Sequence, residues 1–159
     1  MKTIKIYTDG ACKANGKKDA VGGWGYVIFH DSEEAPVKEG SGGEKNTTNN
    51  RMEMLAVINS LAECPENEKI VVYTDSAYIH NCMKQKWYKA WLSNNWVNAS
   101  RQPVKNRDLW EKLIPYFENP LVDFEKVKGH SKDENEHEKW NNVVDKMAVA
   151  AAAKVMKGE

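Results

Sequence analysis

Four acidic residues lie at the ends of predicted apolar strands or within predicted helices, so folding would place their carboxylates beside apolar residues. Asp9 follows one predicted strand and Asp75 follows another, each within the repeated phrase Tyr-Thr-Asp, while Glu53 and Asp145 lie in predicted helices. An ionised carboxylate beside apolar residues costs free energy unless a partner compensates it. Magnesium prefers carboxylate oxygens among its ligands. If the four acids converge, they predict a two-metal site of the kind that cleaves phosphodiesters.

Each acid also has a purely structural interpretation. Aspartate is common in turns and at helix N-caps, which would account for Asp9 and Asp75. Asn50-x-x-Glu53 matches a capping box, in which Glu53 would bond back to the start of its helix. The spacing of the acids does not decide between these interpretations, because their convergence is assumed.

The elements that must position these acids can be predicted from hydrophobic periodicity and turn residues. Strands are predicted at Lys2–Thr8, Trp24–His30, Pro36–Gly43, Lys69–Thr74 and Leu121–Val127, and helices at Asn50–Glu63, Ser76–Met83, Trp87–Asn94, Asn106–Phe117 and Trp140–Met156. The first three strands read as an antiparallel meander, and helices link the later ones. This order predicts an α/β fold with one mixed sheet covered by helices.

Composition narrows the class of protein. The 159 residues suit one domain, and Lys+Arg and Asp+Glu balance at 23 each, so net charge alone gives no case for nucleic-acid binding. No apolar run approaches the ~20 residues of a membrane span. The N-terminus lacks the apolar core of a secretory signal, so a cytoplasmic location is expected. Cys12, Cys64 and Cys82 lack CxxC spacing, which indicates neither a zinc site nor a disulfide framework.

Positive charge is concentrated in one segment. Between residues 84 and 107 the chain has six basic residues and no acid, and it also carries Trp87, Trp91 and Trp96. Basic side chains attract phosphates and aromatic faces stack on bases, so the segment fits nucleic-acid binding. The same pattern fits a helix whose tryptophans enter the core while its lysines face water. The segment alone leaves both interpretations open.

Seven phrases together resemble the bacterial type-1 ribonuclease H family. They are Tyr7-Thr8-Asp9-Gly10-Ala11-Cys12, Thr47-Thr48-Asn49-Asn50-Arg51-Met52-Glu53, Tyr73-Thr74-Asp75-Ser76, Pro103-Val104-Lys105-Asn106, Asp108-Leu109-Trp110, Val127-Lys128-Gly129-His130, and Asn141 four residues before Asp145. The resemblance runs in order from about Lys2 to Ala153. It implies a five-stranded mixed sheet flanked by helices and cleavage of the RNA strand of RNA–DNA hybrids. It also implies two Mg2+ ions during catalysis, with Mn2+ as a substitute, in a monomer that needs no protein partner and no membrane.

The resemblance assigns roles by position. Asp9, Glu53, Asp75 and Asp145 match the metal-binding carboxylates, and His130 matches a loop histidine that assists proton transfer or product release. Asn15, Asn49 and Asn50 match residues near the RNA minor groove, Thr48 and Asn106 match a pocket for a DNA phosphate, and Trp87, Trp91, Trp96 and Lys105 fall in a basic protrusion that grips the DNA strand. We call this protrusion, about residues 84–107, the handle. His30, His80 and His137 have no match and are expected to be structural or on the surface.

The sequence departs from the family pattern in four places. The loop at 16–22 is longer, Asn46 stands where a basic residue is frequent, Ala77 replaces a polar side chain, and the segment from His130 to Asp145 is longer and acidic. None of these changes removes a carboxylate. Two other functions remain open, a DNA junction or transposase-type nuclease on the same fold and a module that binds nucleic acid without cleaving it. The asparagine pair and the handle argue against the first, and the four acids argue against the second.

Overall fold

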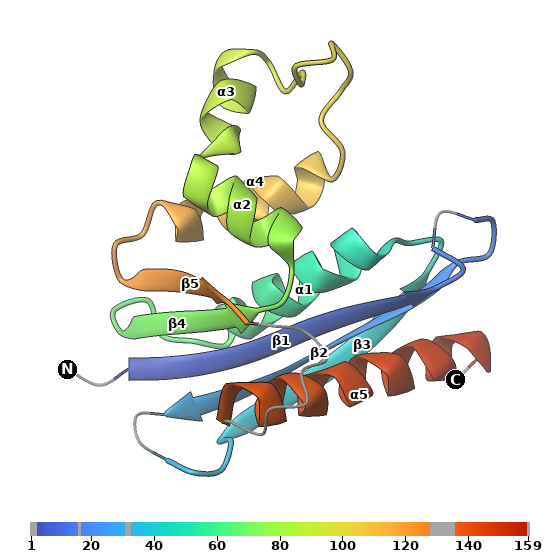
Figure 1. Cartoon of the computed structure of the whole chain (residues 1–159), viewed down its shortest axis with the longest axis vertical. Coiled ribbons are helices and arrows are strands. Elements are labelled where there is room, and N and C mark those ends of the chain that lie inside the picture. The colour runs from blue at the N-terminus through green and yellow to red at the C-terminus, as the bar shows by residue number, and fades with distance from the viewer. Residues whose placement is uncertain (1–2, 16, 31–32, 128–135, 159) are drawn as a thin grey trace.

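The computed structural model describes residues 3–15, 17–30, 33–127 and 136–158. Its elements are β1 (Thr3–Lys13), β2 (Val21–His30), β3 (Lys38–Lys45), α1 (Asn49–Ala62), β4 (Lys69–Thr74), α2 (Ala77–Gln85), α3 (Trp87–Ser93), α4 (Arg107–Phe117), β5 (Val122–Lys126) and α5 (Glu136–Met156). They follow one another in the predicted order. Within this part of the chain the strands form one sheet in the order β3-β2-β1-β4-β5 (Figure 1), so the predicted α/β fold with a five-stranded mixed sheet is confirmed.

Strand pairing in the sheet changes from antiparallel to parallel at β1. Strand β1 pairs antiparallel with β2 and parallel with β4, while β3 extends the antiparallel side and β5 extends the parallel side. The parallel pairing of β1 with β4 stops at Tyr7 and Tyr73, whereas its antiparallel pairing with β2 continues as far as Lys13 and Val21. Figure 1 shows β1 running on past the end of β4. A notch therefore opens in the sheet where β4 ends.

The prediction that the first strand ends at Thr8 is wrong. Strand β1 continues through Asp9, which lies opposite Gly25 of β2. The sequence suggested an end because a charged residue and a glycine interrupt the alternation of apolar residues. Here β2 supplies the backbone hydrogen-bond partners that carry the strand onward, and the buried acid is retained inside it.

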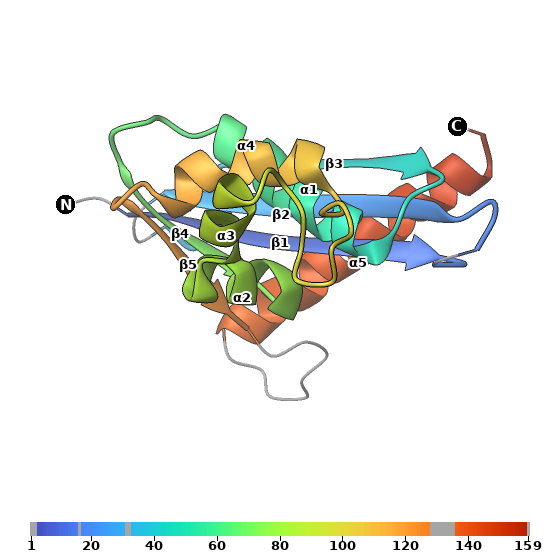
Figure 2. The ribbon, with the colours of Figure 1, turned by 90° about the horizontal axis from the view of Figure 1, so that it is seen from above.

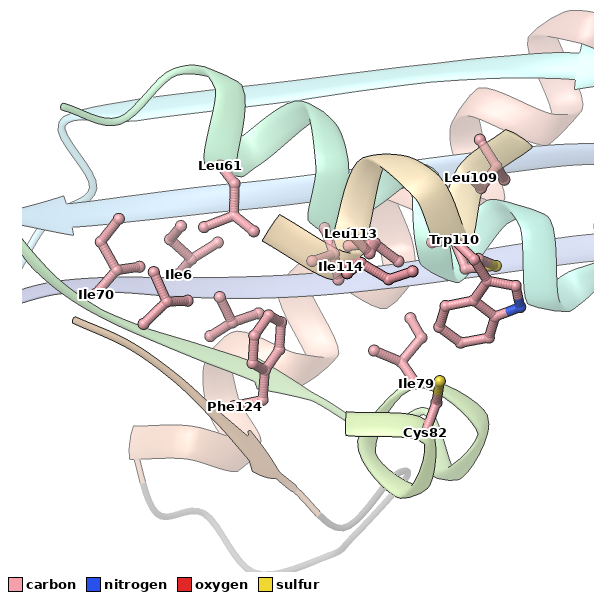
Figure 3. Close-up of a cluster of buried hydrophobic side chains, with 14 of the residues drawn as sticks. Ile6, Leu61, Ile70, Ile79, Cys82, Leu109, Trp110, Leu113, Ile114 and Phe124 are labelled. Atoms are coloured by element: carbon pink, nitrogen blue, oxygen red, sulfur yellow. The ribbon is translucent and has the colours of Figure 1, made fainter. Parts of the chain in front are cut away.

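Helices cover both faces of the sheet. Figures 1 and 2 show α1 to α4 on one face and α5 on the other. The first face holds the larger apolar core, in which side chains from β1, β4, β5, α1, α2 and α4 meet (Figure 3). The second face holds a smaller core made of Tyr7, Val27, Phe29, Tyr73, Val127 and Val144. No helix in the described residues is long and apolar enough to span a bilayer.

Helix α1 begins differently from the capping-box prediction. Its N-cap is Thr48, whose hydroxyl accepts a hydrogen bond from the backbone N–H of Arg51 at 3.2 Å. The threonine therefore satisfies an N–H group that the first turn leaves without a helical partner. Glu53 lies one turn further along and takes no part in this cap, so its carboxylate is free to serve another purpose.

The close approach of α1 to β1 depends on Gly10. A Cβ at this position would collide with the backbone nitrogen of Glu53 and the backbone carbon of Met52. On the opposite face, Gly23 and Gly25 give the same clearance to the backbone of α5. Glycines thus set the distance between the sheet and the two helices that carry Glu53 and Asp145.

We expect Gly10→Ala to lower the free energy of unfolding by about 1–3 kcal/mol, since backbone atoms of α1 must move to admit the methyl group. The melting temperature should fall by roughly 2–4 °C for each kcal/mol lost. Thermal denaturation followed by circular dichroism measures this change. Ala11→Gly, which removes a methyl group from the neighbouring half-exposed position, is the comparison. A Gly10→Ala protein as stable as the wild type would show that α1 does not rest on β1 here.

Candidate active site

Three of the predicted acids converge at the notch. Asp9 comes from β1, Glu53 from the second turn of α1, and Asp75 from the residue directly after β4. Each offers a carboxylate oxygen, and these oxygens all lie within 4.8 Å of one another. Asp145 of α5 lines the same pocket but lies outside this group of three. The structure thus brings the fourth acid to the site without placing it in the tightest cluster.

The register of the sheet places two of these acids side by side. Tyr7 and Tyr73 are paired across β1 and β4, so the aspartates two residues further along each strand emerge at the same level. The hydroxyl of Thr8 donates a hydrogen bond to the carbonyl oxygen of Tyr73 at 3.4 Å and holds the end of β4 against β1. The repeated Tyr-Thr-Asp phrase therefore has a structural basis, because both copies lie at equivalent positions of neighbouring parallel strands.

Burial makes the cluster costly without a cation. Asp9 is only 2% exposed. The backbone N–H of Gly10 donates to its Oδ1 at 2.8 Å, and its other close neighbours are the carboxyl groups of Glu53, Asp75 and Asp145. The Oε2 atom of Glu53 is shielded from solvent and has no hydrogen-bond partner among the described residues. Burial, together with the neighbouring acids, raises the pKa of both carboxyl groups well above their usual range. A hard divalent cation takes such a set of oxygen ligands, so these residues fit a metal site.

We predict that the metal-free protein loses stability as pH rises from about 5 to about 8. Unfolded carboxyl groups titrate near pH 4, whereas those of Asp9 and Glu53 titrate at higher pH in the fold. Over this interval the folded state still holds protons that the unfolded state has already released, so unfolding releases protons and the free energy of unfolding falls as pH rises, by about 1.4 kcal/mol for each pH unit and each retained proton. Denaturant titrations in a chelator at several pH values measure the change. Added divalent cation should reverse the loss of stability. A free energy of unfolding that does not change with pH would contradict the raised pKa values of Asp9 and Glu53.

A hollow of about 550 Å³ surrounds the acids. Besides the four carboxylates, its lining includes Asn49 and Asn50 at the start of α1 and Tyr78 in the first turn of α2. The backbone N–H of Asn49 donates to Oδ1 of Asn15 at 3.0 Å, which ties the β1–β2 connection to the helix. The structure therefore brings the three predicted groove-contacting asparagines to one side of the acid cluster.

An arginine that the sequence analysis passed over joins the two residues of the predicted phosphate pocket. The backbone N–H of Arg51 bonds to Thr48, and its guanidinium donates to Oδ1 of Asn106 at 3.3 Å. Two further bonds, at 3.0 and 2.9 Å, go to the carboxylate of Asp108 at the start of α4. Arg51 thereby connects α1 to α4. No local pattern in the sequence indicates this contact, because Arg51 and Asp108 lie 57 residues apart.

The handle stands away from the sheet, with α3 and the segment after it beyond α4 (Figure 1). Its tryptophans form a chain of ring contacts, with centroid distances of 6.4 Å between Trp87 and Trp91 and 5.9 Å between Trp91 and Trp96. Trp96 is 8% exposed, and the guanidinium of Arg107 lies over its ring. Trp87 and Trp91 are half-buried, and Lys105 is exposed. The handle thus uses its tryptophans for its own packing and keeps part of two rings at its surface.

The expectations for two of the four histidines have different outcomes. His130, the predicted proton-transfer residue, lies outside the described residues. His137 was expected to be structural or on the surface, and its Nδ1 atom lies 2.7 Å from the hydroxyl of Tyr7 in the smaller core. No pattern in the sequence indicates this contact, because 130 residues separate the two side chains.

Comparisons with known proteins agree with this geometry. A family model described as RNase H matches residues 1–153. The chain is 43% identical to ribonuclease H of Clostridium botulinum strain Hall over 148 residues, covering 93% of this chain and 94% of that protein. It is 45% identical to ribonuclease H of Chlorobaculum parvum over 147 residues, covering 92% and 93%.

Solved structures share the fold. The crystal structure of LC9-RNase H1, described as a type 1 RNase H with the type 2 active-site motif, superposes with a TM-score of 0.74 at 25% identity, covering 95% of this chain and 72% of that one. LC11-RNase H1 in complex with an RNA/DNA hybrid gives a TM-score of 0.64 at 22% identity, covering 96% and 99%. The second likeness concerns the fold alone.

Proposed function

The chain belongs to the ribonuclease H family, and we propose that it hydrolyses the RNA strand of RNA–DNA hybrids with two Mg2+ ions held by Asp9, Glu53, Asp75 and Asp145. One observation carries this proposal: three carboxylate groups from separate elements lie within 4.8 Å of one another in an open hollow. Such a cluster is costly in a protein that has no cation to bind, as the shielded Oε2 atom of Glu53 illustrates.

The acids hold the cations and set where the scissile phosphate lies. Divalent cations bound there would supply an activated water and stabilise the leaving oxygen. Asp9 and Asp75 emerge at the same level of neighbouring strands, Glu53 approaches from α1, and Asp145 approaches from α5. The four carboxylates thus approach from both faces of the sheet. A phosphodiester would enter the site from the solvent-exposed side of the hollow. Mn2+, which takes similar oxygen ligands, would substitute for Mg2+.

The asparagines beside the acids provide a means of recognising RNA. Asn15, Asn49 and Asn50 present amide groups next to the acid cluster. Amides both donate and accept hydrogen bonds, as a ribose 2′-hydroxyl does, and this hydroxyl distinguishes RNA from DNA. We assign the strand over the acids as RNA on this basis.

The partner DNA strand would lie toward the handle. Thr48 and Asn106, joined by Arg51, form the proposed phosphate pocket, and Lys105 adds a positive charge next to it. Beyond them the handle offers its lysines and the exposed parts of Trp87 and Trp91. Trp96 is assigned to the packing of the handle instead, because its ring is covered. His130 would assist proton transfer or product release, since imidazole titrates near neutral pH.

The decisive experiment uses an RNA–DNA hybrid with end-labelled RNA, with and without Mg2+. Duplex RNA, duplex DNA and single-stranded RNA serve as parallel substrates. We expect cleavage only of the RNA in the hybrid and only with the cation. Binding of the hybrid without cleavage, in Mg2+ and in Mn2+, would overturn the proposal in favour of a non-cleaving module. Cleavage of duplex DNA would favour the junction-type nuclease.

A further inference from the structure

Three aromatic rings stack on the face of the sheet opposite α1. The rings of Tyr7 and Tyr73 lie 4.8 Å apart and are tilted by 14°, and the imidazole of His137 stacks on Tyr73 at 4.5 Å. The hydroxyl of Tyr7 is 2.7 Å from Nδ1 of His137. These three residues, which we call the ring stack, come from β1, β4 and α5, the elements that carry or immediately precede three of the four acids.

The ring stack lies at the point where the pairing of β1 with β4 ends. Tyr7 and Tyr73 form the last pairing of β1 with β4, and beyond it the two strands separate. Side chains two residues apart along a strand share a face, so each tyrosine lies next to its aspartate. Asp9 and Asp75 lie together at this point, and their charges repel each other whenever both carboxyl groups are ionised.

The imidazole links α5 to the same point. His137 lies in the first turn of α5, and Val144, the residue before Asp145, packs in the same small core as the two tyrosines. The hydrogen bond to Tyr7 and the contact with Tyr73 therefore fix the start of α5 against both strands. The hydrogen bond, the ring contact and the close approach at Gly23 and Gly25 all contribute to setting how far α5 lies along the sheet.

We propose that Tyr7, Tyr73 and His137 are positioning residues that hold the carboxylates at the spacing needed to bind divalent cations. This inference rests on the proposed function, since it assumes that the acid cluster binds the cation. Replacing residues that hydrogen-bond to metal ligands typically changes metal affinity by about 10–100-fold. The ring stack acts on the carboxylates through the strands and the helix that carry them, so we expect an effect at the lower end of this range. A packing role alone would lower stability and leave the affinity of the folded protein unchanged.

The test measures Mg2+ binding to the full chain by isothermal titration calorimetry, without substrate, at a temperature where every variant is folded. Tyr73→Leu removes the central ring, and we expect it to weaken Mg2+ binding about tenfold. Tyr73→Phe keeps the ring and should restore most of the affinity. Tyr7→Phe and His137→Phe each keep a ring but remove the hydrogen bond between these two residues. Because both variants lose the same bond, each single variant and the double variant should weaken Mg2+ binding by one common factor, smaller than the factor for Tyr73→Leu.

Phe29→Leu is the matched control. Phe29 packs edge-on against Tyr7, with centroids 5.9 Å apart, in the same small core, but it lies on β2, which carries none of the four acids. We expect it to lower the melting temperature while Mg2+ affinity changes less than about twofold. Equal losses of affinity in Phe29→Leu and Tyr73→Leu, or no loss in Tyr73→Leu, would overturn the inference. Should Tyr73→Leu not fold, Tyr7→Phe still tests the proposal.

The same titration separates the inference from the proposed function. Wild-type binding that disappears in Asp75→Asn shows that the cation occupies the acid cluster. If that binding is present and the ring-stack variants bind as the wild type does, only the inference fails. If the wild type shows no binding that depends on Asp75, the proposed function fails and the inference fails with it.

Discussion

We expect Asp9→Asn to abolish cleavage of the hybrid, with a loss of at least about 10³-fold, the scale seen when a group that stabilises transition-state charge is removed. The amide keeps the volume of the carboxyl group and an oxygen that can accept the hydrogen bond from Gly10. It removes the negative charge that a divalent cation requires at the centre of the cluster. The same change relieves repulsion among three acids, so the metal-free variant should melt several degrees above the wild type.

Two measurements check this expectation together. Cleavage rates at saturating Mg2+ test the catalytic loss, and melting curves in a chelator test the gain in stability. Asp123→Asn makes the same chemical change on the exposed side of β5 and should leave both quantities near their wild-type values. Turnover of Asp9→Asn close to that of the wild type would show that the cluster is not the cation site. Lower stability without metal would contradict the charge repulsion.

The second large effect concerns the handle. Replacing Lys84 by Ala, Lys86 by Gly and Trp87 by Ala should weaken hybrid binding by about 10–100-fold, because stacking on one aromatic ring is worth about 1–3 kcal/mol. Glycine is used at Lys86 because φ there is 55°, in the left-handed region. Removing two cations should also reduce the slope of log affinity against log salt by about 2. Hybrid binding in Ca2+, measured by fluorescence anisotropy across a salt series, gives both numbers.

A variant that carries only the two lysine substitutions separates the effect of charge on hybrid binding from the effect of tryptophan packing. Lys84→Ala with Lys86→Gly should change the salt slope and leave the melting temperature nearly unaltered, because both side chains are exposed. Lys154→Ala with Lys157→Ala removes the same charge from the end of α5, away from the handle. An unchanged slope in the first pair, or an equal change in the second, would show that the basic segment is only a solvated surface.

Elements with strong local signals could be predicted almost to the residue. The apolar run Lys69–Thr74 is β4 as predicted, and the periodic segment predicted at Asn50–Glu63 differs from α1 by one residue at each end. Burial of one face dictates both patterns, so they are visible in the sequence. The end of β1 was predicted five residues too early, because the partners that continue it come from β2. Similarly, α5 starts at Glu136, four residues before the predicted Trp140.

The types of the site residues were visible in the sequence, but their arrangement was not. The resemblance supplied the four acids by position, whereas the convergence of three of them depends on strand register and on the clearance at Gly10. The capping-box interpretation of Glu53 was wrong because Thr48 had already satisfied the helix start. Arg51 and His137 were passed over because their partners, Asp108 and Tyr7, are distant in the sequence. Contacts between residues so far apart in the sequence produce no periodic pattern in it.

We expect activity to depend on temperature through the two layers that meet at the notch at the end of β4. The acids around it are attached to layers with separate apolar cores, a large one beneath α1, α2 and α4 and a small one beneath α5. Because the smaller core holds Asp145 in place, heating should loosen α5 from the sheet before the larger core melts. Catalysis would then decline at temperatures where most of the secondary structure persists. The temperature optimum of the enzyme would be set by its thinner layer, below the midpoint of global unfolding.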